Sequence, residues 1–279
     1  MTRASAAAIP RVLRYNAGMV ENPADVDPPV EAKKRRRRWF QFSLRSLMIF
    51  VVLFAIACAW FGAKMEKARW QAAVDAIRKD RGLVSYENRL PPPQPAWLRA
   101  LLGDDFFRSP ISACVQTEAG LEQIGEFSQL RFLQLAPTRF SNAGLKHLSA
   151  LNRLESLNLI GARFSDADLE FLTSLPQLQT LVLYNTPITN AGLAHLRGLN
   201  QLRTLDLRET RISDAGLEQL AALARLSVLC VDSPEITDAG VEKLGVLKSL
   251  SSLDIRGTWV TENGAANLKQ ALPDCKIER

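Results

Sequence analysis

A phrase of ten residues returns every 24 residues in this chain, and this regular spacing limits the folds that the chain can adopt. RISDAGLEQL at residues 211–220 is nearly repeated as PITNAGLAHL at 187–196 and as EITDAGVEKL at 235–244. Six copies without insertions begin at Leu130, Leu154, Leu178, Leu202, Leu226 and Leu250. A degenerate copy around residues 117–121 precedes them. Self-similarity at this period predicts a solenoid of stacked coils.

A single unit shows why the phrase repeats. Leu205 and Leu207 fall on one face of a short predicted strand, because strand side chains alternate between the two faces. Ser213 is a predicted helix N-cap, and Asp214 adds negative charge near the positive end of that helix. A helical leucine stripe follows between residues 217 and 223. Since 24 residues cannot bury both apolar faces alone, each coil must bury them against its neighbours.

The repeated line begins L-x-x-L-x-L/V/I and continues through a position that is usually Thr to Ser/Thr, Asp/Asn/Glu and Ala-Gly-Leu. This line resembles the leucine-rich repeat family over about residues 113–279, and its ITDAGL-type phrase resembles the ribonuclease-inhibitor-like and cysteine-containing subclasses. The resemblance implies a right-handed α/β solenoid with parallel strands on the concave face and helices on the convex face. Threonines stand where many members carry Asn or Cys, and the sequence does not say which hydrogen bonds they make: Thr138, Thr186, Thr210 and Thr258.

Two departures from the pattern carry expectations of their own. Asp168 replaces the glycine of the phrase, which indicates that this position does not need a positive φ. The ending LPDCKIER predicts a truncated closing strand with Cys275 and Ile277 facing the core, which gives Cys275 a structural role. The four cysteines have separations that fit neither a zinc site nor a disulfide framework.

An uncharged run, LMIFVVLFAIACAWFGA at residues 47–63, predicts a single transmembrane helix that is retained in the protein. Its length corresponds to about 26 Å of helix, near the short end of what crosses a bilayer. Arg45 and Lys64 bracket the run and can reach the headgroups. The alternatives are a buried core helix, which rarely lacks polar residues all round, and a cleaved signal peptide. Bulky Trp60 and Phe61 stand where a signal peptide needs small residues.

The net charge of +6 is confined to residues 1–46, which carry ten Lys/Arg and four Asp/Glu. Residues 47–279 carry 25 charges of each sign, so the bulk of the chain gives no electrostatic reason to bind nucleic acid. The KKRRRR block at 33–38 favours a cytoplasmic N-terminus and places the repeats on the outer side of the cell membrane. Residues 33–64 are expected to contact membrane lipids.

These features divide the chain into five predicted parts. They are a disordered basic tail (1–46), a transmembrane helix (47–63), a juxtamembrane helix with a Pro-rich linker (64–96), an N-terminal cap with the degenerate repeat (97–129), and six repeats with a C-terminal cap (130–279). Within the linker part, LVSYE at 83–87 is a candidate strand. The front half is similar to membrane-anchored bacterial proteins that carry such repeats, which implies a tethered repeat domain and no reaction.

The strand residues between the leucines are expected to point outward on the concave face, where they form a grid of candidate partner contacts. The candidates are Phe132, Asn158, Ile160, Val182, Tyr184, Asp206, Arg208, Asp232 and Arg256. Apolar and aromatic members on a rigid sheet are the best hot-spot candidates. Just beyond the strands Arg139, Arg163 and Arg211 share one phase, with Trp259 at the matching place, and this edge suits an acidic partner. The alternative is an ordinary solvated surface.

The sequence offers no catalytic, cofactor or metal site. The phosphate-loop, nucleophile-elbow, zinc-protease and dinucleotide motifs are all missing. His147 and His195 lie two repeats apart, roughly 10 Å by strand spacing, which is too far to share a metal. Asp166, Asp214 and Asp238 are explained by helix capping, because calcium needs more oxygen ligands than the unit supplies. No cofactor is expected.

We therefore expect a membrane-tethered binding module that recognises another protein or a cell-envelope component through the concave face, without catalysis. Two other functions stay open at this stage. One is a structural scaffold of the envelope without a high-affinity ligand, and the other is an adaptor for a protein-modifying enzyme.

Overall fold

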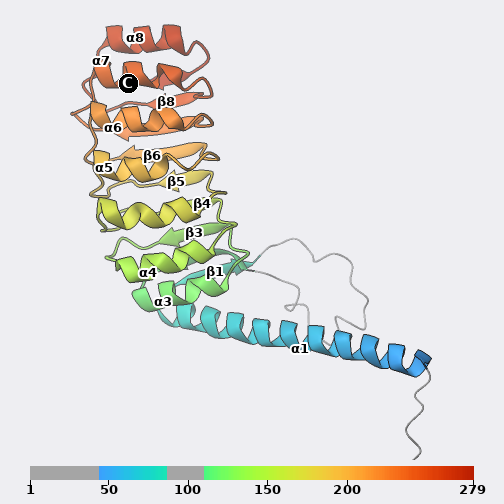
Figure 1. The fold of residues 1–279 in the computed structure, drawn as a ribbon. Helices are drawn as coiled ribbons and strands as arrows, with labels where there is room; N and C mark the ends of the chain where they lie inside the picture. The colour runs from blue at the N-terminus through green and yellow to red at the C-terminus, as the bar shows by residue number, and fades with distance from the viewer. Residues whose placement is uncertain (1–43, 87–109) are drawn as a thin grey trace, which may run out of the picture. The chain divides into compact units, whose positions relative to one another are not determined.

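The structure is a computed structural model that describes residues 44–86 and 110–279 (Figure 1). The described residues fall into two units that divide after Leu53, and all the strands described below belong to the second. The basic tail up to residue 43, the PPPQP break and residues 97–109 of the predicted cap lie outside the described residues.

The strands form a single sheet in chain order, from β1 to β9. The first pair, β1 (Leu83–Tyr86) with β2 (Pro110–Val115), is antiparallel, and every later pair is parallel. The remaining strands are β3 (Phe132–Leu135), β4 (Ser156–Asn158), β5 (Thr180–Val182), β6 (Thr204–Arg208), β7 (Val228–Asp232), β8 (Ser252–Asp254) and β9 (Lys276–Glu278). From β3 onward each strand pairs in register with the residues 24 positions later, as when Ser156 faces Thr180. The predicted stacking of successive copies is confirmed.

Each coil returns to the next strand through a helical segment, and these segments stack in the same order as the strands (Figure 1). The α-helices are α3 (Glu118–Gln123), α4 (Asn142–Lys146), α5 (Asn190–Leu193), α6 (Asp214–Gln219), α7 (Asp238–Glu242) and α8 (Glu262–Ala271). The 3-10 helices are η2 (Ile124–Glu126), η3 (His147–Ala150), η4 (Asp166–Ser174), η5 (Ala194–Leu196), η6 (Leu220–Ala222) and η7 (Lys243–Val246). A 3-10 helix rises about 2.0 Å per residue against 1.5 Å in an α-helix, so it spans the coil with fewer residues.

The leucine skeleton lies in the core between the sheet and the helices. Leu154, Leu178 and Leu226, which open three of the copies, are fully buried. The strand pair Leu205 and Leu207 is buried as well, and the helical stripe that follows it joins the same continuous cluster. This is the α/β solenoid that the repeat predicts. Its last coil is closed by β9, with Cys275 fully buried just before that strand, so the structural role predicted for Cys275 is confirmed.

The first coil is covered by the end of helix α1 (Leu44–Lys79) and by β1. Val74 and Ile77 are buried in the core cluster, with exposures of 3% and 1%. Thr117 in the first repeat donates a hydrogen bond from its hydroxyl to the carboxylate of Asp80 at 2.6 Å. The end of a helix that the sequence analysis assigned to the juxtamembrane part therefore packs on the solenoid, because its apolar side chains complete the first coil.

Within the described residues, α1 contains one segment, Leu47–Lys79, that is long and apolar enough to cross a membrane by length and composition. The large apolar side chains in its first part are exposed, including Ile49, Phe50 and Phe61, whereas Val74 and Ile77 near its end are buried on the solenoid. The helix continues without interruption past residue 63, where the sequence analysis placed the end of the transmembrane part.

Candidate binding surface

The strand residues that alternate with the core leucines form one continuous surface, here called the strand face. Strand pairing sets Asn158, Val182, Asp206 and Cys230 side by side in one row across β4 to β7. Phe132 begins β3, and Arg208 and Asp232 end β6 and β7. The last three candidates lie two residues past the ends of β4, β5 and β8: Ile160, Tyr184 and Arg256. The structure thus brings all nine candidate residues onto one surface.

The N-terminal half of the strand face is uncharged and includes accessible apolar side chains. Phe132 on β3 is 42% exposed and Ile160, just after β4, is 38% exposed. The guanidinium of Arg131 lies 5.7 Å from the ring centroid of Phe132. Asn158 accepts a hydrogen bond from the backbone N–H of Ile160 at 3.0 Å, which fixes the backbone that presents this side chain. Val182 and Tyr184 are half-buried beside them.

The C-terminal half of the strand face carries charged groups that are paired with one another. Arg208 donates to both carboxylate oxygens of Asp206, at 3.0 Å and 2.6 Å, and Arg256 makes the same bidentate contact with Asp254. Asp206 and Asp254 are only 9% and 8% exposed. The hydrogen bond from Arg256 holds the pKa of Asp254 below its usual value. The carboxylate oxygens of Asp206 are therefore largely occupied by hydrogen bonds within the protein. The side chain of Arg256, in contrast, is 61% exposed.

Tyr184 links the two halves of the strand face. Its hydroxyl donates to Glu209 at 2.8 Å, and the guanidinium of Arg208 lies 5.5 Å from its ring centroid. The hydrogen bond to Glu209 and the charge of that carboxylate raise the pKa of Tyr184. Glu209 has a positive φ of 54°, and its carboxylate contacts Tyr184 of the preceding coil. The two residues are 25 positions apart, one more than the repeat, so the 24-residue pattern does not predict this contact.

The remaining polar candidates and the cysteine of this surface are held in defined places. Asp232 pairs in register with Arg208, and its carboxylate occupies the space beside Gly257, where a Cβ atom would come within 2.0 Å. Cys230 lies between Asp206 and Asp254 in the same row, and burial together with those carboxylates raises the pKa of its thiol. All four cysteines are free. Among the described residues no group of three or more His, Cys, Asp or Glu is placed to hold a metal ion.

The turns that follow the strands form a second surface, the turn edge, which consists of Arg139, Arg163, Pro187, Arg211, Glu235 and Trp259. All six are exposed, and Trp259 is exposed to 73%. Their backbones are tied to the preceding coil: Arg163 N donates to Thr138 O at 3.0 Å and Arg211 N donates to Ile188 O at 2.9 Å. The shared phase predicted for the three arginines and Trp259 therefore corresponds to one row along the solenoid.

Two hollows lie on the turn edge. One, of about 610 Å³, is lined by Arg139, Phe140, Arg163, Phe164, Ser165, Asp166, Asp168 and Pro187. The other, of about 430 Å³, is lined by Gly161, Arg163, Asn185, Thr186, Pro187, Glu209 and Arg211. Arg163 and Pro187 line both, so the hollows are neighbours along the row of arginines.

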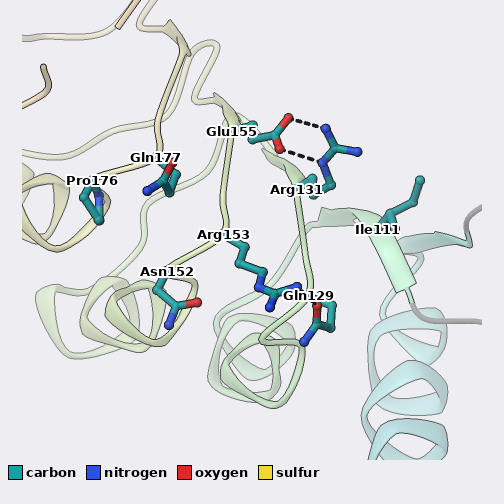
Figure 2. A pocket seen from close by; sticks show the side chains of 8 residues that line it. All are labelled: Ile111, Gln129, Arg131, Asn152, Arg153, Glu155, Pro176 and Gln177. Carbon is teal, nitrogen blue, oxygen red and sulfur yellow. Dashed lines mark hydrogen bonds and ion pairs between the residues drawn. The ribbon is translucent and has the colours of Figure 1, made fainter. Parts of the chain in front are cut away.

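A larger hollow of about 710 Å³ lies at the opposite edge of the sheet, where the strands begin (Figure 2). Figure 2 shows its side chains, among which Arg131 makes a bidentate ion pair with Glu155. Arg153 donates to Gln129 in the same region. Both pairs join residues 24 positions apart, a signal that the sequence contains and that the sequence analysis did not use. These polar groups are engaged with each other, so this hollow is a weaker candidate than the strand face.

The match of a protein-family model agrees with this geometry. Residues 108–277 match the family model of a leucine-rich repeat region. No curated protein matches the chain. Among solved structures, an internalin from Listeria monocytogenes str. 4b F2365 is similar at 20% sequence identity, with a TM-score of 0.35. That match covers 57% of this chain and 56% of the internalin chain, so it spans little more than half of either. Because the family match extends over more than half of its residues, the chain belongs to the leucine-rich repeat family.

Proposed function

We propose that this chain is a membrane-tethered binding protein that recognises another protein, or a component of the cell envelope, through its strand face. The leucine-rich repeat region suggests a protein-binding role, and such domains are typically non-catalytic interaction domains. The observation that carries the choice of surface is the exposure of Phe132 and Ile160 on an ordered sheet. Exposed apolar side chains on rigid elements are the usual anchors of protein interfaces.

Preorganisation supports the same proposal. The strand face is built on parallel pairing with a constant 24-residue register, so its side chains hold fixed relative positions before a partner arrives. Binding to such a surface loses little conformational entropy compared with ordering a loop. Tyr184 is held further by Glu209 and Arg208, and a fixed aromatic side chain costs less to use in an interface.

The proposed tether is the apolar part of α1. The uncharged run at 47–63 lies within the segment that meets the length and composition of a membrane span, and large apolar side chains in it, such as Ile49 and Phe61, are exposed. The lysines and arginines at 33–38 favour a cytoplasmic N-terminus, with the repeats on the outer side of the cell membrane and residues 33–64 in contact with lipids. The five-part division of the chain is part of this proposal.

The binding role is tested by crosslinking the full chain in its native membrane and identifying the partner that it captures. The double variant Val182→Glu/Tyr184→Glu should lose that partner, because two carboxylates would have to be desolvated in the interface. A matched control, Ala222→Glu/Val246→Glu, adds the same charge at exposed positions of the helical segments and should keep it. Equal capture by both variants would remove the strand face from the proposal. A chain that enriches no partner at all would favour the scaffold function.

The topology is tested separately with reporter fusions. A reporter that is active only outside the cytoplasmic membrane should be active after residue 279 and silent at residue 1. A C-terminal reporter that is active only in the cytoplasm would overturn the proposed orientation. Release of the whole chain from membranes by high salt would overturn the span itself, since a transmembrane helix resists such extraction.

A further inference from the structure

We propose that the turn edge recognises a short acidic segment of the partner protein, an extended stretch in which carboxylates alternate with apolar or small residues. The groups that would bind these carboxylates are the guanidinium groups of Arg139, Arg163 and Arg211. This inference rests on the proposed binding function and adds the chemistry of the partner.

The first support is that these guanidinium groups are free to bind. Within the described part of the chain, the side chains of Arg139, Arg163 and Arg211 make no hydrogen bond, ion pair or ring contact. Arginines elsewhere on the same sheet are engaged, since Arg208 and Arg256 each hold a carboxylate. The three free side chains project from backbone positions that are fixed by hydrogen bonds between coils. Fixed positions with unused donors are what bidentate recognition of a carboxylate requires.

The second support is that the carboxylates beside them are already used by the protein. Asp166 accepts the backbone N–H and the hydroxyl of Thr189 at 2.8 Å and 2.5 Å. Asp168 accepts both groups of Ser165 at 2.7 Å. These acidic groups therefore point toward partners within the chain, whereas the arginines that line the hollows keep their hydrogen-bonding capacity for a ligand.

The third support is the spacing of the arginines along the solenoid. Arg139 and Arg211 are three repeats apart, and at about 4.8 Å per repeat this is roughly 14 Å. In an extended peptide the first and third of three alternating glutamates are also about 14 Å apart, at roughly 3.4 Å per residue. The side chains between the glutamates would face the strand face, where Ile160 and Tyr184 each lie three residues before a turn-edge residue. The two hollows offer space for side chains of the ligand.

The charge distribution favours a protein segment over a nucleic acid or an anionic membrane. Residues 111–279 carry 19 acidic and 16 basic residues, and Glu235 stands in the row of the turn edge itself. A long polyanion laid along this row would meet Glu235 and the acidic lining of the hollows, which include Asp166 and Glu209. A few well-spaced carboxylates can contact the three arginines without that repulsion.

The test uses the full chain in detergent and a fluorescein-labelled peptide in which glutamate alternates with leucine and threonine. Fluorescence anisotropy should show binding that weakens as salt rises. The same peptide with glutamine in place of glutamate should bind at least about ten-fold more weakly. The variant Arg139→Gln/Arg163→Gln/Arg211→Gln should lose about ten-fold or more in affinity for the glutamate peptide.

A matched variant controls for the change in net charge. Arg197→Gln/Arg203→Gln/Arg225→Gln removes three exposed arginines away from the turn edge and should bind the peptide within about two-fold of the unmodified chain. Equal losses in the two triple variants would show general attraction to positive charge and overturn the proposal. No measurable binding of the glutamate peptide, or equal binding of the glutamine peptide, would overturn it as well.

The outcome is separable from that of the proposed function. If Val182→Glu/Tyr184→Glu loses the native partner while the two triple variants bind the peptide alike, the strand face stands and the turn edge is wrong. If the peptide distinguishes the triple variants and the strand-face variant keeps its partner, the turn edge stands and the strand face is wrong.

Discussion

Asp214 and Thr237 join two successive coils of the solenoid. The carboxylate of Asp214 accepts the backbone N–H of Thr237 at 2.8 Å and its hydroxyl at 2.6 Å. The same arrangement recurs between Asp238 and Thr261. The sequence analysis assigned these acidic residues to capping of their own helix, and the structure shows that they bind the N-cap residue of the next coil. The repeated Ser/Thr-Asp pair therefore serves adhesion between coils as well as capping.

The glycine of the phrase provides the space that this contact needs. A Cβ at Gly216 would lie 2.4 Å from Oδ1 of Asn190, whose amide makes the equivalent contacts with Ser213. We predict that Gly216→Ala lowers the free energy of unfolding by about 1 kcal/mol, because it displaces that amide. In an Asn190→Ala background the same change should be neutral or stabilising by up to about 1 kcal/mol, since alanine favours helix over glycine.

Urea unfolding of the two single variants and the double variant measures the coupling between the two sites. Additive effects would contradict the prediction. One coil of the protein already lacks the glycine of the phrase and carries Asp168 in its place. There Ser165 donates its hydrogen bonds to Asp168 of its own coil. Asp168 is not among the residues with positive φ, as the sequence analysis expected. The glycine of the phrase is thus required because a Cβ atom would clash with the preceding coil, and not because the backbone is left-handed there.

Ile77 should be essential to the first coil. Its side chain is 1% exposed in the core, so Ile77→Asp would bury a charge and leave a cavity, with an expected loss of about 3 kcal/mol or more. Amide hydrogen exchange should then accelerate in β1 and β2 ahead of β7 and β8, because coils of a solenoid are stabilised chiefly by their neighbours. The exposed Gln71→Asp on the same helix is the control. Unchanged exchange in β1 and β2 would show that α1 does not cap the solenoid.

Glu209 holds a conformation that suits glycine, and Gly161 and Gly257 stand at the equivalent places of other coils with φ of 66° and 77°. Glu209→Gly and Glu209→Ala both remove the hydrogen bond to Tyr184, and only the alanine keeps the steric cost of positive φ. We predict that the glycine variant is more stable than the alanine variant by about 1 kcal/mol in thermal or urea unfolding. An alanine variant as stable as the glycine variant would show that the turn relaxes out of this conformation.

The pair of Asp254 and Arg256 should make stability sensitive to acid. The hydrogen bond from Arg256 lowers the pKa of Asp254 in the folded state below its ordinary value of 3.8. The stabilisation from this pair is therefore fully present above pH 3.8 and is lost as the pH falls through the lower folded-state pKa. Asp254→Asn should be less stable than the unmodified chain at pH 7, and the difference should shrink in this acidic window. The difference in stability is measured from the midpoints of urea unfolding at a series of pH values, with the exposed Asp274→Asn as control. A difference that does not change with pH would show that the Asp254–Arg256 pair does not cause the acid sensitivity.

The hydrogen bonds of the repeated turn threonines could not be inferred from the sequence. The sequence predicted a repeated polar residue in the turn and left its hydrogen bonds undetermined. In the structure Thr186, Thr210 and Thr258 each donate to the carbonyl oxygen three residues earlier in their own coil, at 2.5–2.6 Å. These bonds close the turn inside one coil and do not form a ladder between coils. The choice depends on the turn backbone, which the residue type alone does not specify.

The stacking of the coils can be predicted from the repeated phrase alone. A phrase of 24 residues with leucines at constant positions has two apolar faces and can bury both only against copies of itself, so period and pattern sufficed to predict sheet, helices and core. Which polar groups contact one another became known from the three-dimensional structure. Examples are the contacts of Asp214 with Thr237, of Tyr184 with Glu209 and of Arg208 with Asp206. They depend on the directions of side chains and on the distances between them in the folded chain, and the amino-acid sequence specifies neither of these directly.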